Sequence, residues 1–364
     1  MSRPDAPAEL LPLFDEPRRL AAMVRAGEWP FKGYRVVRDA IVGLELTGGE
    51  VSETDFEVGR VVNATWRDVA VRDCVFQVQS IDAMQLARSR MERCTFAVAA
   101  LQGGRFDHAE FEDCTLTVAE ARDAHAREVK LRRCAVRASQ LESLRMVGVH
   151  VLDSTMSNLR CVTMDVDDLH VVGGELYRLR ISAGEWMHVS IHKAALHEVE
   201  IVQADVGPLL ATECAIGDCS QSEGTSSSIE IQAPVEFAGV RFSAVTLADL
   251  SLSAIREGTL LAILRSVVKG LRIANCHLQE TSFRESRLER TRIVEGGAMR
   301  ELDLRGSHVE GMQFEDGELD GTIQVAGAHL NEWSLGAATL GSGFSIVGEP
   351  DVFTNIDPRL KRGP

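Results

Sequence analysis

The chain has 364 residues, of which 45% are hydrophobic and 26% charged, and its formal net charge is −15 at pH 7. A negative charge of this size disfavours direct binding to nucleic-acid phosphates. No apolar run reaches the roughly 20 residues of a membrane-spanning helix, and no basic-then-apolar signal segment stands at the N-terminus, so we expect no membrane location.

Residues 1–30 are predicted to form a helical cap. The stretch from Asp15 to Ala26 offers Asp15 as the N-cap and Pro17 in the first turn. Leu20, Met23 and Val24 fall on one side of this helix. Because the end of a repetitive fold exposes unpaired backbone and apolar side chains, we interpret the helix as a cap; a docking helix for a partner is the alternative.

Residues 31–218 are built on two nested periods. From about Val36 to Ile216 every fifth residue is apolar, and small residues recur every twenty. The small residues are Cys74, Cys94, Cys114, Cys134, Ser154, Gly174, Ala194 and Cys214, and each is followed two residues later by a larger apolar one, beginning with Phe76 and Phe96. A period of five fits neither a helix nor a flat strand. It is coherent only if the chain turns a corner once per pentad, so that four corners close a coil and successive coils stack at roughly 4.8 Å.

These pentads resemble the pentapeptide-repeat family. The looser family motif has a small residue, a variable residue, a central Leu or Phe and two further residues, and both Cys94-Thr95-Phe96-Ala97-Val98 and Ala109-Glu110-Phe111-Glu112-Asp113 fit it. The resemblance covers about residues 31–346 and implies a right-handed quadrilateral parallel β-helix. The chain departs from the strict form of the motif, which has Ala two residues before the centre and Asp or Asn one residue before it.

The pattern weakens after Ile216. Gly and Ser in residues 219–234 predict an exposed loop insertion. Residues 235–346 are predicted to continue the β-helix from Phe237, with one-residue slips that we interpret as small bulges and with Ala298 as one pentad centre. Residues 347–364 contain three prolines and predict a short capping tail or disorder. The expected fold is therefore all-β, with about 15 coils.

The cysteines are predicted to be buried free thiols. Five of the eight (Cys74, Cys94, Cys114, Cys134 and Cys214) fall in one inward column. No Cys-x-x-Cys pair or Cys/His pair has the spacing of a metal site, and His150 and His170, expected as outward neighbours on adjacent coils, lack further ligands nearby. This usage favours a reducing cytoplasm, and we expect no metal.

The surface is predicted to carry ladders of alternating charge. Asp73, Arg93, Asp113, Arg133 and Asp153 stand twenty residues apart, so stacking brings opposite charges side by side. Each exposed pair contributes little, roughly 0–1 kcal/mol. We expect the ladder to favour correct register, because a slip by one coil would bring like charges together.

No catalytic motif is present, and the filled interior offers no evident pocket, so we expect neither an enzyme nor a cofactor. Two acidic clusters, with solubility and edge protection as the alternative interpretation, are candidate docking sites for a protein with a basic face. The candidate residues are Glu198, Glu200, Asp205, Glu213, Asp218, Glu223, Glu230, Glu236, Glu315, Asp316, Glu318 and Asp320.

The leading functional hypothesis is a rigid, non-catalytic scaffold for protein–protein interaction, with a homodimer formed through a coil end as a possible assembly. The alternative comes from the resemblance. Some pentapeptide-repeat proteins protect type II topoisomerases such as gyrase from inhibitors by imitating duplex DNA, and an acidic chain suits that role.

Overall fold

The protein is an all-β parallel solenoid. The computed structural model describes residues 3–361 and divides into two compact units, residues 1–184 and 185–364. Each unit is built of coils that pair in parallel with the next, and the two units together contain about 16 coils, close to the number predicted. Among the described residues, no helix is long and apolar enough to span a membrane.

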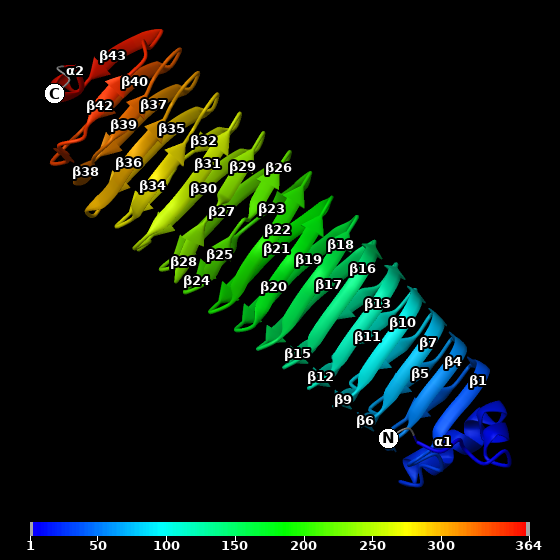
Figure 1. Ribbon diagram of the computed structural model, residues 1–364. Coiled ribbons are helices and arrows are strands. Elements are labelled where there is room, and N and C mark those ends of the chain that lie inside the picture. The colour runs from blue at the N-terminus through cyan, green and yellow to red at the C-terminus, as the bar shows by residue number, and fades with distance from the viewer. Residues whose placement is uncertain (1–2, 362–364) are drawn as a thin grey trace. The chain divides into compact units, whose positions relative to one another are not determined.

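The N-terminal segment packs against the first coil of the first unit. It contains the 3-10 helix η1 (Leu11–Asp15) and the α-helix α1 (Pro17–Arg25), which lie at the blue end in Figure 1. Leu20 and Val24 are fully buried, which confirms the predicted apolar side. The N-cap prediction was wrong, because Glu16 holds that position without a side-chain hydrogen bond. Asp15 instead pairs with Arg38 of the first coil at 2.6 Å.

The first unit begins with five coils of the same design, each with one strand of eight residues and two strands of three residues. These strands and the next long one are β1 (Arg35–Val42), β2 (Glu45–Thr47), β3 (Glu50–Ser52), β4 (Asp55–Val62), β5 (Thr65–Arg67), β6 (Ala70–Arg72), β7 (Val75–Asp82), β8 (Gln85–Ala87), β9 (Arg90–Glu92), β10 (Thr95–Gln102), β11 (Arg105–Asp107), β12 (Glu110–Glu112), β13 (Thr115–Arg122), β14 (His125–Arg127), β15 (Lys130–Arg132) and β16 (Ala135–Glu142). The unit continues with β17 (Leu144–Leu152), β18 (Thr155–Cys161), β19 (Met164–Val172) and β20 (Glu175–Ile181).

The four corners of these first coils are not alike. Three pentad boundaries per coil have left-handed backbone, as at Asn63, Asp68 and Asp73, with φ of 53°, 57° and 52°. The fourth boundary falls inside the eight-residue strand at Val58, Val78 and Val98, which stay extended and buried. A β-branched residue strongly disfavours positive φ, so the chain bends within the strand at this boundary.

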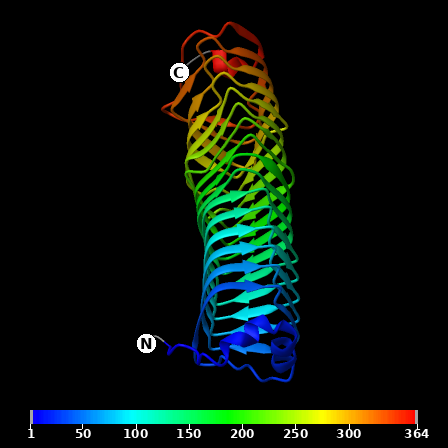
Figure 2. The same cartoon turned by 90° about the vertical axis from the view of Figure 1, so that its right-hand side faces the viewer.

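The central prediction, that residues twenty positions apart lie over one another, is confirmed. Strand β7 pairs in parallel with β4 and β10 so that Phe76 faces Phe56 on one side and Phe96 on the other. Their rings stack at centroid distances of 4.8 and 4.6 Å. Figure 2 shows these strands as a parallel ladder.

The cysteine column is also confirmed. All eight cysteines are free, and Cys74, Cys94, Cys114 and Cys134 are buried one above another. Each thiol donates to the carbonyl oxygen two residues earlier, as Cys94 Sγ does to Glu92 at 3.3 Å. Outside this column, burial raises the pKa of Cys161 to about 12, so that thiol stays protonated at neutral pH.

The second unit begins with the boundary strand β21 (Gly184–His192) and contains β22 (Ala195–Val202), β23 (Ala204–Val206), β24 (Leu209–Thr212), β25 (Ala215–Gly217), β26 (Ser220–Ser222), β27 (Thr225–Gln232), β28 (Glu236–Ala238), β29 (Val240–Ser243), β30 (Thr246–Ser253), β31 (Gly258–Leu264), β32 (Val267–Lys269) and β33 (Arg272–Ala274). It ends with β34 (His277–Ser282), β35 (Arg287–Val294), β36 (Gly297–Asp303), β37 (His308–Phe314), β38 (Gly317–Leu319), β39 (Thr322–Gln324), β40 (His329–Ser334), β41 (Thr339–Leu340), β42 (Ser345–Val347), β43 (Val352–Ile356) and the short helix α2 (Pro358–Lys361).

Residues 219–234 are not the exposed loop insertion that their Ser and Gly content predicts. They form β26 and β27, which pair with coils on both sides. Gln221 and Ser226 take the inward positions that apolar residues hold in the neighbouring coils, and both are buried. Ser226 Oγ donates to Gln221 Oε1 at 2.7 Å, and Gln221 Nε2 donates to the Ala204 carbonyl oxygen at 3.5 Å. The two polar side chains satisfy one another inside the coil, which is why no loop is needed.

The one-residue slips of the second unit are present, but one centre was misassigned. Leu278 pairs with Met299 rather than with Ala298, so the extra residue lies before Met299. The predicted tail contributes a further strand, because β43 pairs with β40. Arg359 then donates to the carbonyl oxygens of Leu335, Gly336 and Ala338 at 2.7, 2.9 and 3.0 Å. The remaining residues of that tail, 362–364, lie outside the described part.

Candidate functional site

The first acidic cluster does not form a single face. Glu200 in β22 and Glu236 in β28 belong to one sheet, whereas Asp205 in β23 and Glu230 in β27 belong to the other. His197 in β22 pairs with Gly217 in β25. Glu198 and Asp218 directly follow these two residues, so they lie at the same corner of consecutive coils. The candidate docking residues therefore surround the coil.

Several of these carboxylates already have partners within the protein. Lys193 lies 3.5 Å from Glu213, and Gln203 Nε2 donates to Glu223 at 2.9 Å. Asp205 accepts the hydroxyl hydrogen of Thr225 at 2.5 Å. Glu198 and Glu200 are engaged in interactions as well. The charge of this cluster is thus partly used to join successive coils.

The second cluster is more localised. Asp316 accepts from the Gly296 amide at 2.8 Å and Asp320 from the Gly343 amide at 2.9 Å, so both hold turns of adjacent coils. Glu318 and Asp320 also line a hollow of about 530 Å³ together with Arg256, Arg300 and other residues of β34 and β36. Because cations of the protein share this hollow, it does not present a purely acidic face to a partner.

The predicted charge ladder is present. Arg93 binds both carboxylate oxygens of Asp73, at 2.7 and 2.8 Å, and Arg133 binds Asp113 at 2.7 and 2.9 Å. Hydrogen bonds from these guanidiniums lower the pKa of each carboxyl group. The pairs break up the negative charge along this side of the first unit.

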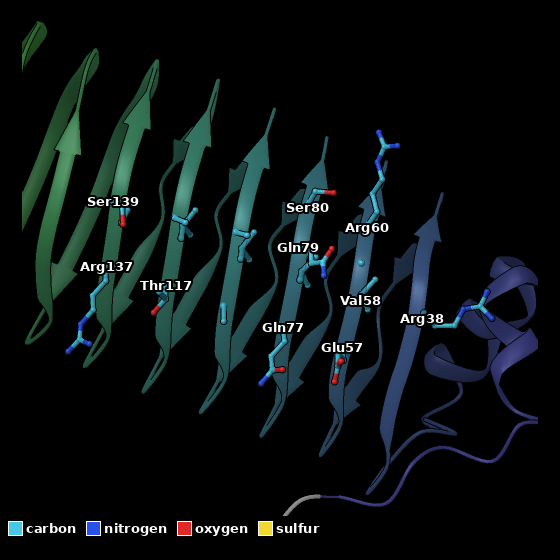
Figure 3. A pocket seen from close by; sticks show the side chains of 18 of the residues that line it. Arg38, Glu57, Val58, Arg60, Gln77, Gln79, Ser80, Thr117, Arg137 and Ser139 are labelled. Atoms are coloured by element: carbon cyan, nitrogen blue, oxygen red, sulfur yellow. The ribbon is translucent and has the colours of Figure 1, made fainter.

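A long concave feature of the first unit was not predicted from the sequence. It is a groove of about 1170 Å³ that crosses β1, β4, β7, β10, β13 and β16 and reaches Asn158 of β18. It follows the bend at the fourth pentad boundary of these coils. Figure 3 shows Gln77, Thr117 and Arg137 along one side of the groove and Gln79, Ser80 and Ser139 along the other.

Small outward side chains keep the groove open. Ala97, Ala99, Ala119 and Ser139 are exposed on its surface. The charged residues at its edges are mostly paired: Arg60 lies 2.6 Å from Asp82, and Glu57 pairs with Arg35. The sequence does contain a signal for the bend. Valines recur at positions 58, 78, 98 and 118, whereas the equivalent positions at the other corners of the coils carry mainly polar residues.

His150 and His170 lie as neighbours on adjacent coils, as expected, with ring centroids 5.0 Å apart. Trp66 and Trp186 are buried in the core. Within residues 3–361 no group of three or more His, Cys, Asp or Glu side chains is placed to hold a metal ion.

Comparison with known proteins does not assign the chain. No protein-family model matches the sequence, and a search of the curated proteins finds no match either.

Proposed function

We propose that the protein is a non-catalytic interaction scaffold that binds an extended polypeptide segment of a protein partner in the groove of its first unit. The observation that carries this proposal is the groove itself, about 1170 Å³ in volume and lined by six successive long strands. At a strand spacing of about 4.8 Å these strands give a binding length of roughly 25 Å, enough for about seven extended residues.

The lining of the groove suits a polypeptide. Ala97, Ala99 and Ala119 offer a shallow apolar surface, while Gln77, Gln79 and Thr117 offer hydrogen-bond donors and acceptors to a backbone. Most of the charged edge is already neutralised by internal pairs, so recognition rests on shape and hydrogen bonding. The acidic residues of the second unit are a further contact region for a partner with a basic face.

We also propose that the chain is a degenerate, long member of the pentapeptide-repeat family with a right-handed quadrilateral coil. The period of five and the parallel pairing of residues twenty positions apart support this assignment. The bend that replaces one corner in the first coils is a departure from the regular form. A cytoplasmic location fits the eight free cysteines, and a homodimer through a coil end remains a prediction.

The scaffold function is tested with variants whose large side chains fill the groove. Ala99→Trp and Ala119→Trp place large rings on its exposed surface, and Ala87→Trp in β8 is the matched change on the other sheet. Tagged proteins are used to recover partners from the native cell, after thermal unfolding has shown that all variants are folded. Loss of the same partner from both groove variants, with retention by Ala87→Trp, supports the proposal; partners retained by both groove variants contradict it.

The alternative, DNA mimicry directed at a type II topoisomerase, draws support from the net charge of −15 alone. The Arg93–Asp73 and Arg133–Asp113 pairs, and the division of the acidic residues between two sheets, argue for the scaffold. A gyrase supercoiling assay with inhibitor distinguishes the two, because a DNA mimic protects the enzyme and a scaffold of unrelated partners does not.

A further inference from the structure

One hollow of the first unit is basic, against the charge of the whole chain. It has a volume of about 400 Å³ and lies across β11, β14 and β17. Its charged and titratable lining consists of Arg105, Arg127, Arg145 and His125 with a single carboxylate, Asp107. All five of these residues are exposed. Three guanidiniums therefore meet at one place on a protein whose net charge is −15.

The strand register makes this hollow an exception to the charge ladders. Arg105 pairs with His125, and His125 pairs with Arg145, so three basic residues follow one another in a single column. In the ladder of Asp73, Arg93, Asp113 and Arg133, by contrast, the sign alternates from coil to coil. In the column of the hollow, Arg105 and Arg145 lie on either side of His125, with no carboxylate between them.

Two of the three guanidiniums of the hollow have no carboxylate partner in the described part of the chain. Among residues 3–361 neither Arg105 nor Arg145 forms an ion pair, although Asp165 follows Arg145 in register and Asp107 shares the hollow. Arg127 has only Glu128, at 3.9 Å. Arg93, by contrast, lies 2.7 Å from its carboxylate. The donors of Arg105 and Arg145 remain available to an external anion.

We propose that this hollow binds a phosphate monoester group. Guanidinium donors match the oxygens of a phosphate in bidentate geometry, and they do so better than an ammonium group. The excess of three Arg over one carboxylate balances a dianion, whereas a single carboxylate ligand needs only one of them. The site is separate from the proposed groove, which follows the long strands of the other sheet, and does not depend on it.

The test is calorimetric titration of the full chain at constant ionic strength, with inorganic phosphate and with a phosphoserine peptide as probes. The unphosphorylated peptide is the control ligand. The Arg105→Gln/Arg145→Gln variant is expected to bind about tenfold more weakly or worse, because it loses two charge-assisted contacts. Arg88→Gln, which removes a guanidinium paired with Asp68 outside the hollow, is expected to bind as the parent protein does.

Folding is not expected to limit this experiment, because both substituted arginines are exposed and surface substitutions away from buried features change stability little, so the double variant keeps its thermal stability. Arg127→Gln provides a second, single change in the same hollow and is expected to weaken binding as well. Tighter binding of the peptide than of inorganic phosphate identifies a phosphorylated side chain as the source, and equal binding identifies free phosphate. Absence of binding to both probes, or equal affinity in the parent and double variant, overturns the proposal.

Discussion

Ser226 donates a 2.7 Å hydrogen bond to Gln221 inside a coil, at positions where neighbouring coils carry apolar side chains. Removing the hydroxyl in Ser226→Ala leaves the buried Gln221 oxygen without this partner. We expect a loss of about 1–3 kcal/mol in the free energy of unfolding, measured by chemical denaturation. The double change Gln221→Leu/Ser226→Val, which removes both polar groups, is expected to recover most of that loss. A single variant as stable as the parent contradicts this account of the core.

The Arg93–Asp73 pair leads to a prediction about register. Arg93→Asp places three aspartates in consecutive coils at 73, 93 and 113, whereas Arg93→Ala removes the cation without adding a charge. We expect Arg93→Asp to lower the midpoint of thermal unfolding more than Arg93→Ala does, and added salt to narrow the difference. Equal thermal midpoints of the two variants at low salt would mean that the charge ladder does not contribute to stability.

The C-terminal coil depends on Arg359. Its guanidinium donates to three carbonyl oxygens and pairs with Asp357 at 3.0 Å. Arg359→Ala leaves those carbonyls to water, and we expect a local loss of about 1–3 kcal/mol. Hydrogen exchange is the suitable measurement, because amides of β43 and β40 should exchange faster while those of β4 and β7 stay unchanged. Uniform acceleration in both units argues against a local cap.

The buried cysteines predict a loss of stability in alkali. Burial raises the pKa of Cys161 to about 12 and is the main cause that raises that of Cys276 to about 11. In the unfolded chain a thiol ionises near pH 8.5, so the contribution is complete below about pH 8.5 and is lost as the pH rises toward the folded values. Denaturant titrations at about pH 8 and pH 10 measure this, and Cys161→Ala/Cys276→Ala is expected to reduce the dependence. If the free energy of unfolding of that variant falls with pH as steeply as that of the parent protein, Cys161 and Cys276 are not the cause of the alkaline loss.

Helix α1 packs so closely against the first coil that a side chain at Gly49 is expected to destabilise the protein. A Cβ atom there would lie 2.1 Å from the Val24 carbonyl oxygen, and the residue has φ of +87°. Gly49→Ala is therefore expected to displace α1 from the first coil and to lower the thermal midpoint, whereas Gly48→Ala meets no atom within 4 Å and carries only the strain of its φ of +69°. The displacement of α1 is measured by limited proteolysis, and we expect faster cleavage near α1 in Gly49→Ala. Equal resistance of Gly49→Ala and Gly48→Ala to the protease contradicts the prediction.

The amino-acid sequence by itself determined the stacking. The spacing of Cys74 and Cys94 and of Phe76 and Phe96 recurs over many coils, and a repeated period leaves only one register in which all the inward residues coincide. The free thiols and the Arg93–Asp73 pair followed from the same repetition, because each depends on position within the period and not on any one neighbour. The apolar side of α1 followed instead from the helical spacing of Leu20 and Val24.

Only the tertiary structure decided the features that break the period. Gln221 and Ser226 look like loop residues in isolation, and their burial depends on a hydrogen bond that exists only when both point into one coil. The position of Met299 depends on which residue the neighbouring strand leaves unpaired. The groove arises where buried valines bend a strand in place of a corner, and the basic hollow where Arg105, His125 and Arg145 meet across coils. Such features arise from packing between coils, which local propensity does not encode.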